Sequence, residues 1–110
     1  MKEVKKVKFT ESQQEIADYF RVLSNPARIA ILQHIIDQKA CICSDLVDEI
    51  GLAQATISQH LKEIKDAGII QGSVEGKSIC YCINPDKWKE VQDLFNAFFD
   101  QEIIISTSCK

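Results

Sequence analysis

Two Cys-x-Cys pairs are the residues of this chain best suited to chemistry. Cys41 and Cys43 lie in the segment ACICSD, and Cys80 and Cys82 lie further along the chain in ICYCIN. Thiolate sulfur binds zinc and soft ions, and it also oxidises reversibly to disulfides. In the cytosol stable disulfides are rare, and cysteine pairs there more often indicate metal or redox chemistry. The two pairs therefore predict a thiol site if the fold brings them together.

The residues between the cysteines predict how the pairs could meet. Side chains alternate between the two faces of a strand, so in a short strand at 41–43 Ile42 faces the core and both cysteines face outward. In a strand at 78–83 the inward residues are expected to be Ile79, Tyr81 and Ile83, and the outward ones Cys80 and Cys82. Antiparallel pairing of Ile42 with Tyr81 places Cys41 opposite Cys82 and Cys43 opposite Cys80, with opposed Cα atoms about 4.5–5.5 Å apart.

Three uses of such a sulfur patch are open. The four thiols could hold a soft ion as thiolates. They could form one or two cross-strand disulfides and sense oxidants or reactive sulfur. They could also be ordinary small packing residues, since free cysteine is often buried. Cys109, in the tail after the apolar run 103–105, is either an additional ligand or a free thiol.

Length and composition define the class of protein. The chain has 110 residues, of which 45% are hydrophobic and 26% charged, which fits one domain over 1–110 with flexible tails at 1–9 and 103–110. No apolar run is long enough to cross a membrane, and the charged N-terminus MKEVKKVKF is unlike a signal peptide, so a cytoplasmic protein without membrane contact is expected.

An enzyme is not expected. The sequence lacks a Cys-x-x-Cys redox motif and a glycine-rich phosphate loop after a strand, and its only histidines are His34 and His60. We therefore expect no organic cofactor. A net charge of −3 argues against nucleic acid as a partner, but the acidic excess lies partly near the C-terminus and leaves the middle of the chain free to face phosphate.

Start and stop signals predict five helices and a hairpin. The first helix begins with a capping box at TESQ, the second at Asn25-Pro26, the third at Ser44 and the last at Asn84-Pro85. The fourth helix spans 54–66. Gly51 is expected to end the third helix. Two strands at 69–71 and 78–83, joined by a loop at 72–77, follow the fourth helix. The order predicts a mainly α fold with a small antiparallel sheet, a winged helix-turn-helix.

The outward face of the fourth helix is polar and mostly uncharged. Such a face can read base edges or hold phosphates, whereas a merely solvated face is more often rich in Glu and Lys. The candidate DNA-binding residues on this helix are Gln54, Thr56, Ser58, Gln59, His60 and Lys62. Lys77, at the tip of the hairpin, could meet a phosphate or the minor groove. A winged-helix domain used only for protein contacts is the competing interpretation.

Three segments carry a resemblance to a known family. VLSNPARIAIL, DLVDEIGLAQATISQHLKEIKDAGII and GSVEGKSICYCINPDKW resemble the ArsR-type repressors, in register over roughly residues 14–98. The resemblance implies a homodimer, joined through its first and last helices, that binds an inverted-repeat operator in double-stranded DNA and releases it when an inducer binds.

The resemblance also bears on the inducer. Arsenic and cadmium sensors of this family carry a Cys-x-Cys directly before the Asp that opens the third helix, whereas here Ser44 intervenes before Asp45. The last helix, KWKEVQDLFNAF, lacks the histidine of another metal site of the family. We therefore expect the sensing site at Cys41, Cys43, Cys80 and Cys82. Its expected ligand is trivalent arsenic, as arsenite, or antimonite, with Zn or Cd as soft divalent alternatives.

Overall fold

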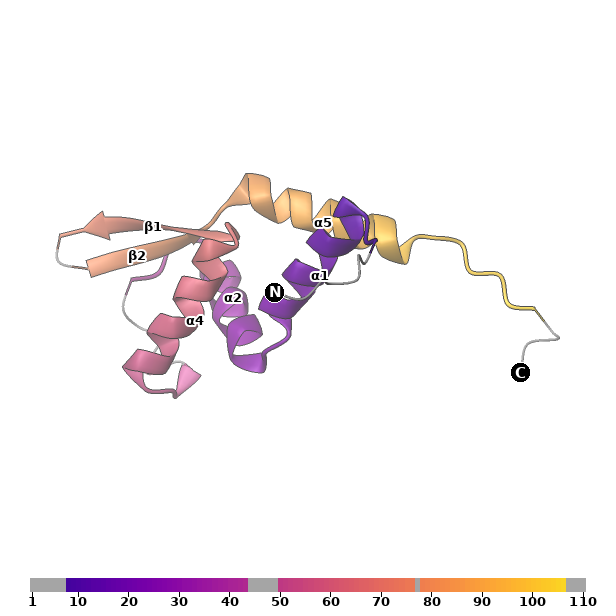
Figure 1. Cartoon of the computed structure of the whole chain (residues 1–110). Coiled ribbons are helices and arrows are strands. Elements are labelled where there is room, and N and C mark those ends of the chain that lie inside the picture. Colours follow the sequence, from indigo (N-terminus) through magenta and orange to yellow (C-terminus); the bar gives the residue numbers. More distant parts are fainter. Residues whose placement is uncertain (1–7, 44–49, 77, 107–110) are drawn as a thin grey trace, which may run out of the picture.

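The computed structural model describes residues 8–43, 50–76 and 78–106 (Figure 1). In chain order the elements are α1 (Glu11–Leu23), α2 (Pro26–Gln38), α4 (Gln54–Asp66), β1 (Ile70–Glu75), β2 (Ser78–Ile83) and α5 (Pro85–Phe99). Four of the five expected helices are therefore present in the part of the chain that is described. The expected third helix begins outside it, but Ile50 is helical and Gly51 follows with a φ of 84°, the left-handed conformation that commonly ends a helix.

Three of the predicted helix starts are confirmed, and the fourth, at Ser44, lies outside the described residues. Thr10 and Gln13 form the full capping box of α1, with each side chain bonded to the other's backbone amide. The side chain of Asn25 accepts from the amide of Ala27 at the start of α2, and that of Asn84 accepts from the amide of Lys87 at the start of α5. These caps satisfy amides that the first turn leaves without a partner, so local sequence fixes where the helices begin.

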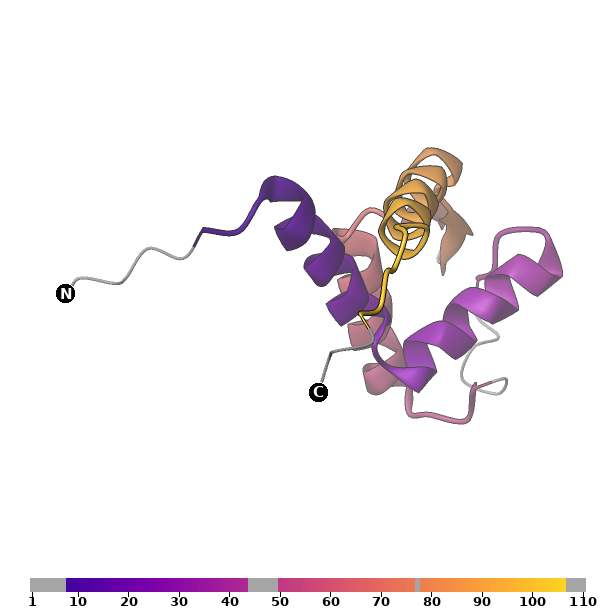
Figure 2. The same cartoon turned by 90° about the vertical axis from the view of Figure 1, so that its right-hand side faces the viewer.

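The core lies where α2 and α4 meet the base of the hairpin. The inner face of α4 contributes Ile57, Leu61 and Ile64 at helical spacing, and all three are buried. From the other elements the buried core residues are Tyr19, Ile31, Leu32, Ile35, Ile42, Ile69, Ile70 and Val91. α1 packs against α5 and α2, and Figure 2 shows it beside α5, which is seen nearly end-on. The core packing fixes the position of α4 and leaves its opposite face to solvent.

The hairpin is longer than the sequence indicated. β1 and β2 pair antiparallel from Ile70↔Ile83 to Glu75↔Ser78, so most of the expected loop at 72–77 is strand. Gly76, with a φ of 64°, lies in the tight turn beyond the last pair, where a left-handed residue is required. Figure 1 shows the hairpin projecting from the helical body as a wing.

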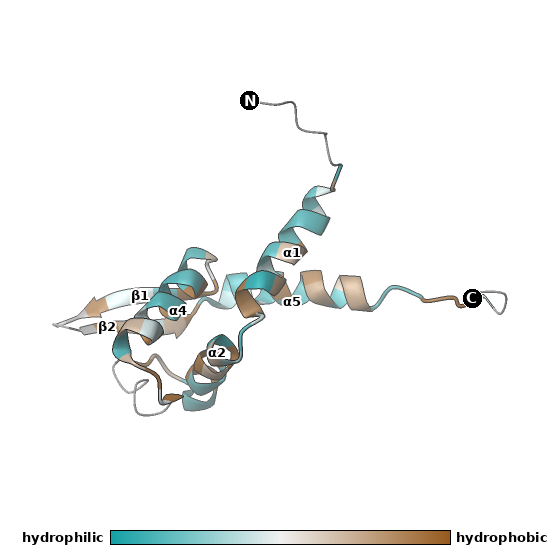
Figure 3. Cartoon of the chain, turned by 60° about the horizontal axis from the view of Figure 1, so that its bottom comes forward, coloured by the Kyte–Doolittle hydropathy of each residue, from teal (hydrophilic) through white to brown (hydrophobic). Residues whose placement is uncertain are grey.

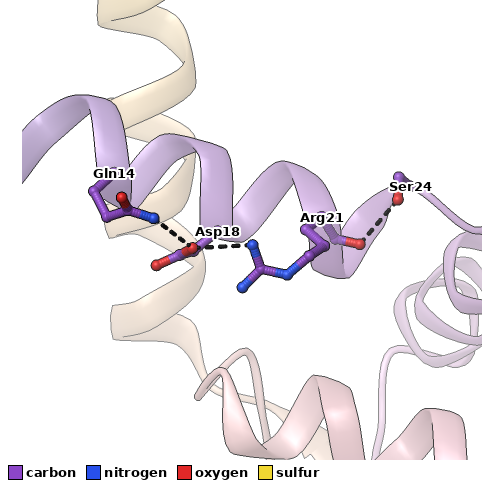
Figure 4. Close-up of polar contacts among 4 residues, drawn as sticks. All are labelled: Gln14, Asp18, Arg21 and Ser24. Carbon is purple, nitrogen blue, oxygen red and sulfur yellow. Dashed lines mark hydrogen bonds and ion pairs between the residues drawn. The ribbon is translucent and has the colours of Figure 1, made fainter. Parts of the chain in front are cut away.

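α1 has two different faces. On one, polar side chains bond along the helix: the Gln14 amide and the Arg21 guanidinium both donate to Asp18 at 3.1 Å, and Ser24 caps the Arg21 carbonyl (Figure 4). On the other, Phe20 stacks on Phe95 of α5 at 4.5 Å between ring centroids. The aromatic face continues along α5 to Phe98 and Phe99, which are exposed. The last turns of α5 are mostly brown in Figure 3, where brown marks hydrophobic residues. No helix of the described residues is long and apolar enough to cross a membrane.

Candidate sulfur cluster and nucleic-acid interface

Residues 41–43 add a short third strand segment beside β2. Ile42 and Tyr81 form an antiparallel bridge, with Ile42 N donating to Tyr81 O at 2.9 Å and Tyr81 N donating to Ile42 O at 2.7 Å. Ile42 is buried in the core. This is the register predicted from the alternation of the Cys-x-Cys pairs, and it ties the end of α2 to the wing.

The bridge brings the four cysteines together in two pairs. Cys41 forms a disulfide with Cys82, with their Cα atoms 4.3 Å apart, and Cys43 forms a disulfide with Cys80, with their Cα atoms 4.0 Å apart. The two bonds flank the Ile42–Tyr81 bridge on either side. Segment 41–43 is therefore held to β2 by backbone hydrogen bonds in its centre and by sulfur at both ends.

The expected facing of β2 is wrong at two positions. Cys80 was expected to face outward but is only 3% exposed, and Ile79 was expected to face inward but is 50% exposed. Cys80 is covered because segment 41–43 lies against it and Cys43 bonds to it. Ile79 is exposed because it pairs with Val74 on the projecting part of the wing, beyond the reach of the helical core. The sulfur cluster is therefore partly shielded.

The donor chemistry of the cluster fits a thiophilic ion only after reduction. A sulfur in a disulfide is not a thiolate, and among the described residues no group of three or more His, Cys, Asp or Glu side chains is placed to hold a metal ion. Reduction would release four thiols from two neighbouring strands, a donor set that soft ions and zinc prefer. Cys109 lies outside the described residues.

The outer face of α4 presents the predicted polar side chains to solvent. Its exposed members are Gln54, Thr56, Ser58, Gln59 and Lys62. Several are bonded one helical turn apart: Gln54 to Ser58 at 3.1 Å, Gln59 to Glu63 at 3.1 Å and Lys62 to Asp66 at 2.9 Å. Such exposed pairs are weak and can exchange for contacts to a partner. Lys77 lies outside the described residues.

His60 differs from the other candidates because it is half-buried and already bonded. Its Nδ1 accepts a hydrogen bond of 3.0 Å from Arg28 Nε, and Arg28 also donates to the Val22 carbonyl at 3.2 Å. An accepting Nδ1 places the ring proton on Nε2, so His60 offers a partner one donor and no acceptor. Arg28 was missed by the sequence reasoning. Its signal is a lone cation within the apolar run PARIAIL.

The charged side chains of α4 are concentrated in its second half. A groove of 310 Å³ between α1 and α4 is lined mainly by acidic and neutral residues: Glu15, Asp18, Tyr19, Arg21, Val22, Glu63, Asp66 and Ala67. Phosphate would be repelled there. The pKa of Lys62, in the second half of the helix, is raised above its usual value by its hydrogen bond and ion pair with Asp66. The first half of α4, residues 54–60, carries no acidic side chain and so lacks the negative charge of the groove.

Comparison with known proteins agrees with this arrangement. Residues 25–71 match the family described as bacterial regulatory protein, arsR family. The chain is 34% identical over 82 residues to an uncharacterized HTH-type transcriptional regulator of Methanocaldococcus jannaschii, covering 74% of this chain and 91% of that protein. It is 31% identical over 97 residues to the arsenical resistance operon repressor of Staphylococcus xylosus, covering 88% of this chain and 86% of that protein.

Other relatives are longer, and the chain covers 47% and 59% of the length of two of them. Among solved structures, HlyU from Vibrio cholerae superposes with a TM-score of 0.66 at 19% identity, covering 84% of this chain and all of that one (100%). At that level of identity the likeness shows the fold, a winged helix-turn-helix.

Proposed function

Because this chain belongs to the ArsR family of bacterial regulatory proteins, which are DNA-binding transcription regulators and not enzymes, we propose that it is a cytoplasmic, homodimeric repressor. In this proposal two copies bind an inverted-repeat operator and release it when the sulfur cluster at Cys41, Cys43, Cys80 and Cys82 reacts. The observation that carries the sensing role is the meeting of all four sulfurs on segment 41–43 and β2.

The first half of α4 supports DNA reading. Its exposed amides and hydroxyls can donate and accept at base edges in a major groove. The N-cap residue Ala53 makes no side-chain hydrogen bond, so the first-turn amides are not capped by a side chain and can meet a phosphate at the positive end of the helix. The wing projects from the helical body (Figure 1), where it can contact the DNA backbone next to the site read by α4.

The aromatic face of α1 and α5 supports the homodimer. Phe98 and Phe99 are 49% and 65% exposed, and Phe20 is 38% exposed although it stacks on Phe95. Aromatic side chains contribute strongly to interfaces, and clustered exposed ones mark a contact surface. A second copy packed against this face would bury them and set the distance between the two α4 helices, which must match two operator half-sites.

Trivalent arsenic is the first candidate inducer. In the reduced protein, Cys41, Cys43, Cys80 and Cys82 would hold it, because a thiophilic ion prefers thiolate ligands. The arsenical resistance operon repressor of Staphylococcus xylosus is among the relatives, which supports this ligand class. Antimonite, zinc and cadmium share the same donor preference.

Oxidation is the second candidate signal, and the paired cysteines favour it. A two-electron oxidant such as a peroxide converts one thiolate to a sulfenic acid. The facing thiolate then attacks that sulfur, so that the disulfide forms and hydroxide leaves and is protonated to water. Each cysteine of the cluster has a partner on the adjacent strand with its Cα about 4 Å away. No backbone movement is needed to bring the sulfurs together.

Both candidates would act through the same mechanical link. Segment 41–43 leads toward Gly51 and α4, and β2 is one side of the wing. When the sulfurs are joined, the bridge at Ile42–Tyr81 is fixed at both ends. When they are free thiols, two backbone hydrogen bonds remain. A signal can shift the protein out of its DNA-bound state only if it favours one of the two states over the other. Here the two states would differ in how firmly sulfur bonds hold segment 41–43, and so the position of α4, relative to the wing.

The test starts from the operator. A binding sequence is selected from random duplex DNA with the reduced protein, and its affinity is measured while arsenite or peroxide is titrated. Weaker binding for the wild type, absent in Cys80→Ser/Cys82→Ser, supports the cluster as the sensor. Loss with arsenite alone identifies the ion, and loss with peroxide alone identifies oxidation.

Three controls separate the roles. Salt dependence of the affinity establishes phosphate contact. Gln59→Ala should weaken specific binding more than non-specific binding, because only base contacts carry sequence information. If neither reagent changes the affinity of the wild type, the sensing role is wrong while the DNA-binding role stands. If no sequence is selected and binding is independent of salt, a protein-contact role replaces DNA reading.

A further inference from the structure

The segment after α5 is unusually apolar for an exposed chain end. Ile103, Ile104 and Ile105 follow one another and are 78%, 82% and 79% exposed. Figures 1 and 3 both show this segment leaving the end of α5 and running away from the helical body. Three adjacent isoleucines in water are unfavourable, and a contiguous exposed apolar patch usually marks a contact.

A groove of matching character lies at the same end of the molecule. It has a volume of 450 Å³ and runs between the start of α1 and the end of α5. Its lining consists of uncharged residues: Thr10, Ser12, Gln13, Ile16, Leu94, Ala97, Phe98 and Gln101. About a quarter of the residues of the chain are charged (26%), yet neither the groove lining nor residues 103–105 include a charged side chain. Such a groove suits an extended chain with isoleucine side chains.

The geometry favours a second copy over the chain's own segment. Gln101 lines the groove, so the segment begins at its rim and leads outward from it. That exit is held by two hydrogen bonds of 2.8 Å, from Asp100 N to the Asn96 carbonyl and from Gln101 Nε2 to the Phe98 carbonyl. To reach its own groove the chain would have to reverse within about two residues, which breaks this end of the helix.

We propose that residues 103–105 of one copy dock in the groove between α1 and α5 of a second copy, so that exchanged C-terminal segments extend the dimer interface. The inference rests on the proposed homodimer. The groove contains Phe98, which also belongs to the aromatic face of that interface, so the two contacts are continuous. Neither side carries a charge, so the partner is recognised by shape and by the apolar part of the lining, which is Ile16, Leu94, Ala97 and Phe98.

Dimer strength is the first test. Replacing the three isoleucines with serine should raise the dimer dissociation constant, measured by sedimentation in the absence of DNA, by at least about tenfold. Val74→Ser is the matched control, because Val74 is 75% exposed but lies on the wing. It should leave the dissociation constant unchanged. An unchanged constant in the isoleucine variant overturns the proposal.

Cross-linking then identifies the occupant of the groove. Ile104→Cys and Ala97→Cys are made in separate proteins, both carrying Cys109→Ser and one carrying a larger tag. After mixing and oxidation, a covalent heterodimer supports docking in the partner's groove. A protein with both changes that cross-links only within itself shows docking in its own groove and overturns the proposal. Dimers without the cross-link overturn only this inference, whereas a monomeric wild type also overturns the proposed homodimer.

Discussion

α4 and segment 41–43 both carry candidate functional residues, but opposite kinds of interaction hold them. α4 is one continuous helix whose inner face, Ile57, Leu61 and Ile64, is buried in the core. Segment 41–43 joins β2 through one backbone bridge and two disulfides that span 41 and 37 residues of sequence. The helix is therefore held by apolar packing, which is insensitive to redox state. Segment 41–43 has one buried apolar residue, Ile42, and is held in addition by sulfur bonds that are sensitive to redox state.

This difference suggests a division of roles. A reading surface has to keep its shape in every state of the cell, and a helix on an apolar core does so. A sensing element has to change its restraints with a chemical signal, and a strand held by sulfur does so. The following predictions test whether the two regions are as independent as this comparison implies.

The largest effect is expected at the inner face of α4. Ile57→Ala should lower the free energy of unfolding by about 2–5 kcal/mol, because the side chain is 1% exposed and its loss leaves a cavity. Thr56→Ala, the neighbouring exposed position, should change it by less than about 0.5 kcal/mol. Urea unfolding measures both. Equal effects at the two positions would contradict the assignment of inner and outer faces.

Reduction of the disulfides should lower the free energy of unfolding somewhat less than Ile57→Ala does. Dithiothreitol is expected to lower the free energy of unfolding by about 2–4 kcal/mol, because it opens loops that the disulfides close in the unfolded chain. The variant with all four of Cys41, Cys43, Cys80 and Cys82 changed to Ala is the control, and its unfolding should be independent of the reductant. A wild type that unfolds identically with and without dithiothreitol would show that the disulfides do not form in solution.

The stabilising effects of the two disulfides should not be additive, so removing the first should lower the free energy of unfolding less than removing the second. Because Cys43–Cys80 lies within the loop already closed by Cys41–Cys82, we expect Cys43→Ala/Cys80→Ala to retain more than half of the stabilisation. The same holds for the reciprocal pair of changes. Unfolding measured under oxidising conditions compares them, and additive losses would indicate that the bridges restrain different parts of the chain.

Arg28 connects α4 to the other helices and should have a smaller effect. Arg28→Gln removes the bonds to His60 and to the Val22 carbonyl, at a cost of about 0.5–1.5 kcal/mol each. If the pair also positions α4, affinity for the selected operator should fall by more than affinity for random DNA. Arg28→Lys, which keeps the charge but not the two-armed geometry, should not restore it. Restored affinity would mean that only the charge matters.

The smallest effect on stability is expected at Lys62. Its ion pair with Asp66 is exposed, so Lys62→Met should leave unfolding unchanged. If Lys62 meets a phosphate, the slope of log affinity against log salt should become shallower by about one. Lys89→Met is the matched control, because Lys89 pairs with Asp93 in the same spacing on α5. A Lys89 variant with the same change in slope would remove α4 as the phosphate-binding helix.

Much of the fold follows from the sequence because its signals are local. Thr10, Asn25 and Asn84 were expected to begin helices and do so, since a cap depends only on the next few residues. The polar face of α4 follows from helical periodicity. The pairing of Ile42 with Tyr81 was also predictable, because a strand alternates and both Cys-x-Cys pairs enclose one apolar residue.

Other features required the tertiary structure. The length of β1 was underestimated because Gly72 and Ser73 resemble loop residues, whereas their pairing partners in β2 keep them in the strand. The burial of Cys80 and the exposure of Ile79 depend on what covers each end of the wing. The bond from Arg28 to His60 joins residues 32 positions apart on two helices. Local preference determines elements and faces, but only packing between distant segments decides which faces are covered and which side chains meet.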